Sequence, residues 1–185
     1  MTALSTQIIS PRLLLRAWQP QDRAAFAAMN ADIEVMRYFP APMTEDESNA
    51  AAERYNMQLE RDGYTMFAVE ERESSRFVGV IGAQQMRFTV PGLPAPTVEI
   101  GWRLALHAQG KGFATEGARA VLDYLRDETK LTEVYAVTAP DNIASQRVMH
   151  KLGMKQLPAL SFDHPLVAPD SPRRRHVLFS MEITR

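Results

Sequence analysis

Two spacings of apolar residues along this chain predict its secondary structure. Apolar residues that alternate with polar ones, or form short runs, predict strands, and apolar residues three to four positions apart predict helices. The predicted strands are residues 13–15, 64–70, 77–83, 98–104, 133–138 and 175–183, and the predicted helices are residues 20–29, 44–63, 112–126 and 142–152.

Cap and turn signals bound these elements. Thr44 followed by Glu47 matches a capping box, and Gly63 and Gly153 are typical of helix ends. Prolines mark a loop over residues 91–96. Four further prolines without apolar periodicity predict a long loop over residues 158–172, on the surface or over a site.

The order of these elements predicts the fold class. Antiparallel hairpins come early and strand–helix crossovers come late, so we expect an α/β fold with a single mixed, largely antiparallel sheet and flanking helices. The 185 residues contain no internal repeat and no linker-like segment. The sequence therefore predicts one domain, residues 1–185.

Composition and charge exclude several classes of protein. The net charge of −1 offers no basic field for nucleic acid, and the run from Arg173 to Arg175 is either a solvated loop edge or a local anion site. The absence of cysteine excludes disulfides, iron–sulfur clusters and thiol nucleophiles. His107, His150, His164 and His176 lack metal-ligand spacing and are interpreted as surface or loop residues, so no metal is expected.

The sequence gives no sign of a membrane or export segment. No apolar run approaches the roughly 20 residues that span a bilayer, and residues 1–11 lack the features of a signal peptide. We therefore expect a cytoplasmic protein with neither membrane nor nucleic acid as a partner.

The segment from Gln109 to Thr115 is the strongest chemical signal. A glycine-rich turn that opens a helix exposes backbone N–H groups able to hold a phosphate, and Lys111 adds positive charge. A P-loop is excluded because Ala105 and Gly112 occupy two of its required positions, and a dinucleotide fingerprint is weak because Thr115 replaces its third glycine. A tight strand-to-helix turn without a ligand is the alternative.

A family resemblance favours the phosphate interpretation. Gln109, Gly112 and Ala114 match the pyrophosphate loop of the GCN5-related N-acetyltransferase (GNAT) superfamily. Residues 98–102 (VEIGW) resemble its fourth strand, and Asn142, Ser145, Val148, Lys151 and Gly153 match its helix after the fifth strand. Residues 12–18 (RLLLRAW) resemble the opening of the RimJ/RimL-like branch, which acetylates the N-termini of ribosomal proteins.

The resemblance implies an acetyl-CoA-dependent enzyme. It implies that the fourth and fifth strands splay apart and that the pantetheine arm of the cofactor pairs with the backbone of Trp102, Arg103 and Leu104. The side chains of these three residues are expected to matter less than their register. The pyrophosphate would lie on Gln109, Gly110, Lys111, Gly112, Phe113, Ala114 and Thr115.

Asn142 and Ser145 each carry two interpretations. The resemblance implies that Asn142 hydrogen-bonds the cofactor arm, whereas helix capping is the simpler role. Ser145 is the candidate for protonating the leaving thiolate, or it is merely a helix residue. The tyrosine that many relatives carry near the cofactor sulfur corresponds to Met149, so tyrosine is not expected to be the acid.

Glu99 is the candidate general base. It alternates with Val98 and Ile100 and therefore points to the other face of the sheet, where it is either exposed to solvent or able to deprotonate an amine. The aromatic side chains of Trp18, Phe26, Tyr38 and Phe39 either line the acceptor pocket or belong to the core.

The resulting hypothesis is acetyl transfer to a primary amine by direct attack in a ternary complex. The amine is a protein N-terminal α-amine or a small molecule, and the oligomeric state, which includes a homodimer, is left open. One alternative is a non-catalytic acyl-CoA sensor, which release of the free thiol would distinguish. Nucleotide binding by a Rossmann-like unit is disfavoured by Thr115 and by the mixed strand order.

Overall fold

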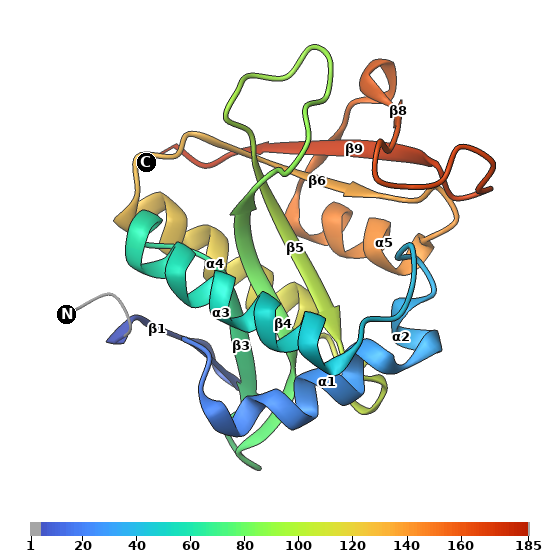
Figure 1. The fold of residues 1–185 in the computed structure, drawn as a ribbon. Coiled ribbons are helices and arrows are strands. Elements are labelled where there is room, and N and C mark those ends of the chain that lie inside the picture. The colour runs from blue at the N-terminus through green and yellow to red at the C-terminus, as the bar shows by residue number, and fades with distance from the viewer. Residues whose placement is uncertain (1–4, 185) are drawn as a thin grey trace.

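The structure, a computed structural model, describes residues 5–184. Residues 1–4 and 185, the two ends of the predicted domain, lie outside the described residues. The described strands form one open, mostly antiparallel sheet, and helices pack on both of its faces (Figure 1). The mixed α/β fold class predicted from the order of the elements is therefore confirmed.

Nine strands make up the sheet in the described chain, in the spatial order β1-β2-β3-β4-β5-β6-β9-β7, with β8 paired to β9. All six predicted strands are present, with boundaries that differ by up to two residues. The strands are β1 (Gln7–Ile9), β2 (Leu13–Arg16), β3 (Met66–Glu71), β4 (Arg76–Gln85), β5 (Val98–Leu104), β6 (Glu133–Thr138), β7 (Lys155–Gln156), β8 (Phe162–Asp163) and β9 (Arg175–Glu182).

The predicted helices are also present. Thr44 and Glu47 form the expected reciprocal capping box, and Gly63 ends that helix with a φ of 77°. Residues 20–29 begin with a short 3-10 turn before the α-helix proper. The helices are α1 (Arg23–Ala31), α2 (Ile33–Met36), α3 (Glu45–Asp62), α4 (Phe113–Glu128) and α5 (Ile143–Leu152), with 3-10 turns at η2 (Pro20–Asp22), η3 (Leu106–Ala108) and η4 (Pro158–Leu160).

Several short elements depart from the sequence-based expectation. Strand β1 and helix α2 were not predicted, because three or four residues are too few to display a period. The expectation of a long loop over residues 158–172 is wrong in part, since this segment contains η4 and β8. Strand β8 pairs Phe162 with His176 of β9 and so fastens the segment to the sheet edge.

The core divides into two clusters, one on each face of the sheet. Helix α4 contributes Phe113 and Leu125 to one cluster, where they pack with Ile81. On the opposite face, Phe26 of α1 packs with Val80. Ile81 and Val80 are neighbours on β4, so this strand is buried on both faces, which accounts for its continuous apolar run.

The sheet opens between β5 and β6. These strands are parallel, and Glu99 with Tyr135 is the one register pair between them in the described chain. Strand β5 meanwhile pairs with β4 from Val98 to Leu104. Beyond Glu99, β5 and β6 diverge (Figure 1), which confirms the predicted splay of the fourth and fifth strands of the family, here β5 and β6.

No helix among residues 5–184 combines the length and the apolar character that a bilayer crossing requires.

Candidate active site

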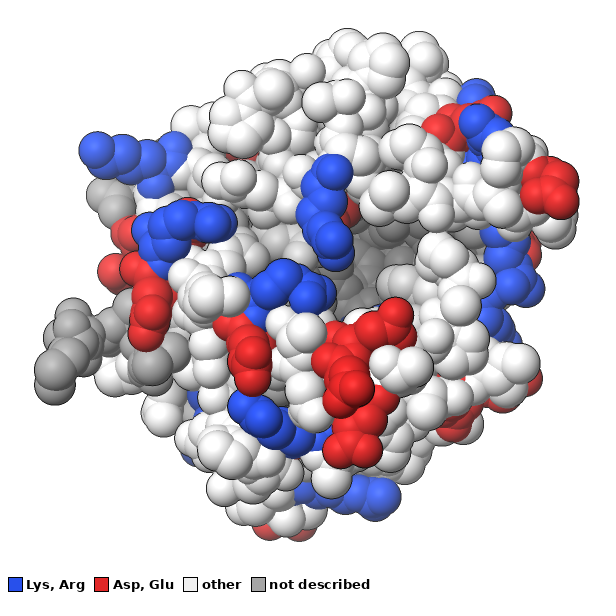
Figure 2. Space-filling model, viewed as in Figure 1, with Lys and Arg blue, Asp and Glu red and all other residues white. Residues whose placement is uncertain are grey.

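A wedge between β5 and β6 is the centre of the candidate site. Glu99 lies at its narrow end, where the two strands are still paired. One wall is β5, and the other is formed by β6 and the α5 helix that follows it. Figure 2 shows the surface hollowed right of centre, where Figure 1 places the divergence of these elements, with charged side chains of both signs around the rim.

A tight turn lies at the open end of the wedge. After β5 the chain makes the η3 turn and then passes Gly110 and Gly112, whose φ angles are 75° and 83°. These left-handed values favour glycine over any residue with a Cβ. The side-chain amide of Gln109 donates a 3.0 Å hydrogen bond to the carbonyl of Leu104 and so fixes the turn to the end of β5.

The turn delivers an uncapped helix N-terminus. Gly112 is the N-cap of α4 and supplies no side-chain cap, and the first backbone bond of the helix runs from the Glu116 N–H to the Gly112 carbonyl at 3.1 Å. The N–H groups of residues 113–115 therefore have no helical acceptor. Together with the helix dipole, they form a site suited to a phosphate.

Arg12 holds this turn against the first hairpin. Its guanidinium donates to the Lys111 carbonyl at 3.0 Å, forms a 2.6 Å ion pair with Glu116, and lies 4.7 Å from the centre of the Phe113 ring. Burial would raise the pKa of Glu116, but hydrogen bonds from Ser10 and Arg12 outweigh it and lower that pKa. Glu116 is therefore ionised but neutralised by Arg12, and it does not oppose an anion at the turn.

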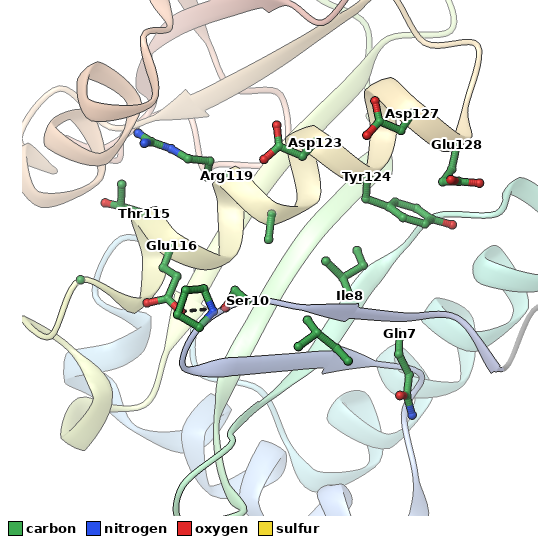
Figure 3. A pocket seen from close by; sticks show the side chains of 14 residues that line it. Gln7, Ile8, Ser10, Thr115, Glu116, Arg119, Asp123, Tyr124, Asp127 and Glu128 are labelled. Carbon is green, nitrogen blue, oxygen red and sulfur yellow. Dashed lines mark hydrogen bonds between the residues drawn. The ribbon is translucent and has the colours of Figure 1, made fainter.

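A groove of about 750 Å³ runs between β1 and α4, on the other side of this turn. Figure 3 shows the Ser10 hydroxyl pointing to Glu116 across its lower end. Of the predicted site residues, only Gly112 and Thr115 line it, and Asp123 and Asp127 lie along its far part. The groove is therefore separate from the wedge that holds Glu99.

The three residues at the end of β5 differ in their surroundings. Leu104 is buried, and Trp102 packs beside it against the cluster under α4. Arg103 points to the opposite face, where its Nη1 donates to the sulfur of Met36 at 3.2 Å and its guanidinium lies 4.9 Å from the centre of the Phe39 ring. The sequence did not predict these side-chain contacts of Arg103.

Asn142 begins the far wall of the wedge. Its side-chain oxygen accepts the N–H of Ser145 at 3.2 Å, and its amide nitrogen donates to Thr138 Oγ1 on β6 at 3.0 Å. The capping role of Asn142 is thus confirmed, and the role in cofactor binding stays a prediction. The half-buried Ser145 lies one turn into α5, and the next turn carries Met149, which is buried in the core.

Glu99 is half-buried, so the expectation that it is simply exposed to solvent is wrong. Its carboxylate accepts a 2.8 Å hydrogen bond from the amide of Gln84, the residue opposite it on β4. Burial raises the pKa of Glu99 and outweighs the hydrogen bond from Gln84 and the charge of Arg87, which both lower it. A carboxyl group with a raised pKa is suited to exchanging protons near neutral pH.

The aromatic candidates divide between the core and the site. Trp18 and Phe26 are buried in the cluster under α1 and α3. Tyr38 is half-buried and Phe39 is exposed, and both follow α2. The Tyr38 hydroxyl donates to the carbonyl of Asp141 at 3.4 Å, next to the cap of α5.

The interpretation of all four histidines as surface or loop residues is wrong for His176. It lies in β9 with 7% of its surface exposed and packs at a tilt against His164, their ring centres 4.7 Å apart. Within residues 5–184, no group of three or more His, Asp or Glu side chains is arranged to hold a metal ion.

The fold thus brings most of the predicted residues to one wedge. Glu99 and the end of β5 form one wall, Asn142 and Ser145 begin the other, and the turn from Gln109 to Thr115 closes the open end. The partners that hold them in place are Arg12, Gln84 and Thr138, none of which the sequence reasoning assigned to the site. The contact of Gln84 depends on the register between two strands, and that of Thr138 depends on where the cap of α5 lies. Neither can be known before the fold is known.

Comparison with known proteins places these features in context. Residues 12–155 match the family described as acetyltransferase (GNAT) domain. YnaD of Bacillus subtilis (strain 168), named an uncharacterized N-acetyltransferase, is 32% identical over 149 residues, which cover 80% of this chain and 82% of that protein.

Solved structures show the same fold. An acetyltransferase (GNAT family) from Bacillus anthracis superimposes with a TM-score of 0.78 at 27% identity, over 96% of this chain and 99% of that one. RimL, the ribosomal L7/L12 α-N-protein acetyltransferase in complex with coenzyme A, gives a TM-score of 0.76 at 16% identity, over 96% of this chain and 98% of that one. At that identity, the likeness to RimL concerns the fold alone.

Proposed function

The chain belongs to the GNAT family of N-acetyltransferases, and from that premise we propose that it transfers the acetyl group of acetyl-CoA to a primary amine by direct attack in a ternary complex. The observation that carries this proposal is the uncapped N-terminus of α4, which follows two left-handed glycines at the open end of the wedge.

The residues present fit the cofactor. The free N–H groups of Phe113, Ala114 and Thr115 would receive the pyrophosphate, and Gln109, Gly110, Lys111 and Gly112 would complete the turn around it. Within residues 5–184, the backbone of Trp102, Arg103 and Leu104 has no strand partner on the side of β6, so it is free to pair with the amides of the pantetheine arm. When bound, acetyl-CoA supplies a thioester whose carbonyl carbon accepts the amine.

Glu99 is proposed as the general base. Only a neutral amine has the lone pair that attacks a carbonyl, and Glu99 would take the proton directly or through a water molecule. An α-amine with a pKa of about 7.7 to 8.0 is partly neutral at pH 7, whereas a lysine-type amine near 10.4 is almost wholly charged. The need for Glu99 therefore depends on the acceptor.

Ser145 is proposed as the acid that protonates the leaving thiolate. Its hydroxyl forms no hydrogen bond within the described chain, and its backbone N–H is held by Asn142. A thiol with a pKa near the roughly 8.5 of cysteine leaves tolerably well without help, so Ser145 would assist without being indispensable. The amide of Asn142 keeps a second N–H with which it could also bind the cofactor arm.

The acceptor is proposed to be a small-molecule amine or a protein N-terminus. The likeness to RimL supports the second at the level of fold alone. We also propose that residues 1–185 act as one domain in the cytoplasm.

Two measurements test the proposal. Acetyl-CoA should raise the melting temperature of the protein by mass action, whereas ATP and NAD at the same concentration should not. With a panel of amines present, acetyl-CoA should then release free thiol in step with the amine consumed. A protein that is stabilised by ATP or NAD, but not by acetyl-CoA, would contradict the assignment of the turn.

A further inference from the structure

Arg103 on β5 lacks a counter-ion among the described residues. The strand places its side chain on the face of the sheet that α1 and α3 cover, beside Val80, its register partner on β4. The Nε atom of Arg103 is buried and has no hydrogen-bond partner, and no acidic side chain among residues 5–184 forms an ion pair with it. A buried donor of a cation without a partner is unfavourable, because burial removes the water that would solvate it.

Neutral groups surround the guanidinium instead. It lies 4.9 Å from the centre of the Phe39 ring and 5.8 Å from that of Phe26, and Nη1 donates to the Met36 sulfur. Aromatic faces and a thioether attract a cation weakly and leave the Nε donor unsatisfied. Burial accordingly lowers the pKa of Arg103.

The segment that holds Arg103 also reaches across the wedge. Met36 and Phe39 contact Arg103 of β5, while Tyr38, between them, bonds to the carbonyl of Asp141 on the other wall. The guanidinium of Arg173 also lies 5.5 Å from the centre of the Tyr38 ring. Residues 36–39 therefore bridge the two walls, and Arg103 lies on the β5 side of that bridge.

Arg103 is not placed to serve the pyrophosphate. Its strand neighbours Trp102 and Leu104 pack toward the α4 cluster, so Arg103 points away from α4 and from its uncapped N-terminus. Glu99, in contrast, lies four residues earlier on the same face as Arg103, at a spacing of about 13 Å along the strand. The proposed base and the unpaired cation thus face the same side of β5.

From this arrangement we propose that Arg103 binds a carboxylate of the acceptor, and that the acceptor is a small amino carboxylate whose amine is directed to Glu99. This inference rests on the proposed acetyl transfer and adds the class of substrate to it. The carboxylate supplies the anion that the guanidinium lacks, in the paired geometry that arginine forms best. The charges of both signs around the hollow suit an acceptor of this type (Figure 2).

The test compares each acceptor with its own amide. Linear amino carboxylates of increasing chain length are paired with the matching carboxamides, and kcat/KM is expressed per neutral amine, since the amide changes the pKa of the amine. Wild-type protein should favour one carboxylate over its amide by at least tenfold. Arg103→Met should remove that preference. Arg103→Lys keeps the positive charge but lacks the two parallel N–H donors of the guanidinium, and it should retain part of the preference.

Two controls separate this role from a structural one. Arg61→Met removes a cation whose side chain is 66% exposed and should leave the preference unchanged. Acetyl-CoA should bind Arg103→Met with a Kd close to that of the wild type, because the proposed pairing with the pantetheine arm uses only the backbone of residue 103 and its side chain points away from the pyrophosphate turn. If Arg103→Met fails to fold, the wild-type preference and Arg103→Lys still decide.

The outcomes distinguish the two proposals. Acetylation of amines by the wild type with no preference for the carboxylate would overturn the role of Arg103 and leave acetyl transfer standing. Weaker binding of acetyl-CoA to Arg103→Met would also overturn the role of Arg103 in binding the acceptor, since its side chain would then serve the cofactor. A protein that binds acetyl-CoA but acetylates neither member of any pair would overturn the amino-carboxylate acceptor, and the proposed function itself would fall only if the wider panel of amines released no free thiol either.

Discussion

Glu99 accepts a hydrogen bond of 2.8 Å from the side-chain amide of Gln84, the residue directly opposite it on the neighbouring strand β4. This bond favours the charged form of Glu99, while burial favours the neutral form and prevails. The carboxyl group therefore titrates at a higher pH than an ordinary glutamate and lies where β5 and β6 begin to separate.

The pH dependence of turnover follows from this relationship. Because the pKa of Glu99 is raised, the wild-type rate should fall on the acid side at a pH above the 4.5 of an ordinary glutamate. Glu99→Gln should lower turnover mainly at low pH, and raising the pH toward the pKa of the amine should recover part of the loss. Pre-steady-state or steady-state pH–rate profiles on one acceptor measure both effects.

Gln84→Leu complements Glu99→Gln, because it leaves the carboxyl group of Glu99 in place and changes its surroundings. It removes the hydrogen bond that lowers the pKa of Glu99, so the acid limb of the profile should move to higher pH. If Glu99→Gln equalled the wild type at every pH, Glu99 would not be the base, and water or the intrinsic pKa of the amine would suffice.

Ser145→Ala should slow turnover by about tenfold or less, and higher pH should not restore it, because the proton of Ser145 is proposed to go to the sulfur. The substitution keeps the backbone N–H that Asn142 caps, so the melting temperature should stay close to that of the wild type. Asn142→Ala, which removes the cap, should cost about 1 kcal/mol of stability. An unchanged kcat in Ser145→Ala would show that the thiolate leaves without this residue.

Gly112→Asp should weaken acetyl-CoA binding by at least tenfold, or roughly 1.4 kcal/mol. The new side chain strains a backbone with a φ of 83° and places a negative charge at the proposed phosphate site. Gly63→Asp is the control, because Gly63 has a similar φ of 77° at the end of α3, remote from the wedge. Equal Kd values for the folded Gly112→Asp protein and the wild type would place the phosphate elsewhere.

The sequence predicted the long, regular elements well. The helix after Thr44 shows the reason: a capping box, an apolar period and a terminal glycine all agree there. Strand β1 and helix α2 could not be predicted, because their positions depend on pairing with β2 and on a side-chain cap from Asp32. Single caps and strand pairings, not an apolar period, specify such short elements.

The site was predicted in its glycine turn and in the strand and helix residues that match the family. The contacts among the residues of the site were not predicted from the sequence. That Gln84 lies opposite Glu99 depends on the β4–β5 register, and that Arg12 holds the turn depends on a contact between residues about a hundred positions apart. The sequence also placed Arg103 on β5 but could not show that its guanidinium would be left without an anion.

His164 should make stability depend on pH. Burial and the neighbouring His176 lower the pKa of His164 to about 4, below the roughly 6.5 of the unfolded chain. The unfolded state therefore binds the proton first as pH falls, so the stabilisation is complete above pH 6.5 and is lost toward pH 4.

His164→Phe keeps an aromatic ring for the contact with Phe88 and removes the titration. Between pH 7 and pH 5, the free energy of unfolding should fall by about 1 kcal/mol more in the wild type than in the variant, after allowance for partial exposure. Urea unfolding at the two pH values measures the difference, and parallel losses in both proteins would refute the assignment.

The most direct test of acetyl transfer to an amine is mass spectrometry of a cell extract incubated with the protein and isotopically labelled acetyl-CoA. We expect labelled acetyl groups to appear on the amine of a specific acceptor, and we expect the Gly112→Asp protein to yield much less of the same product. A protein that binds acetyl-CoA and yet transfers label to no amine would contradict acetyl transfer and would leave a non-catalytic acyl-CoA sensor in its place.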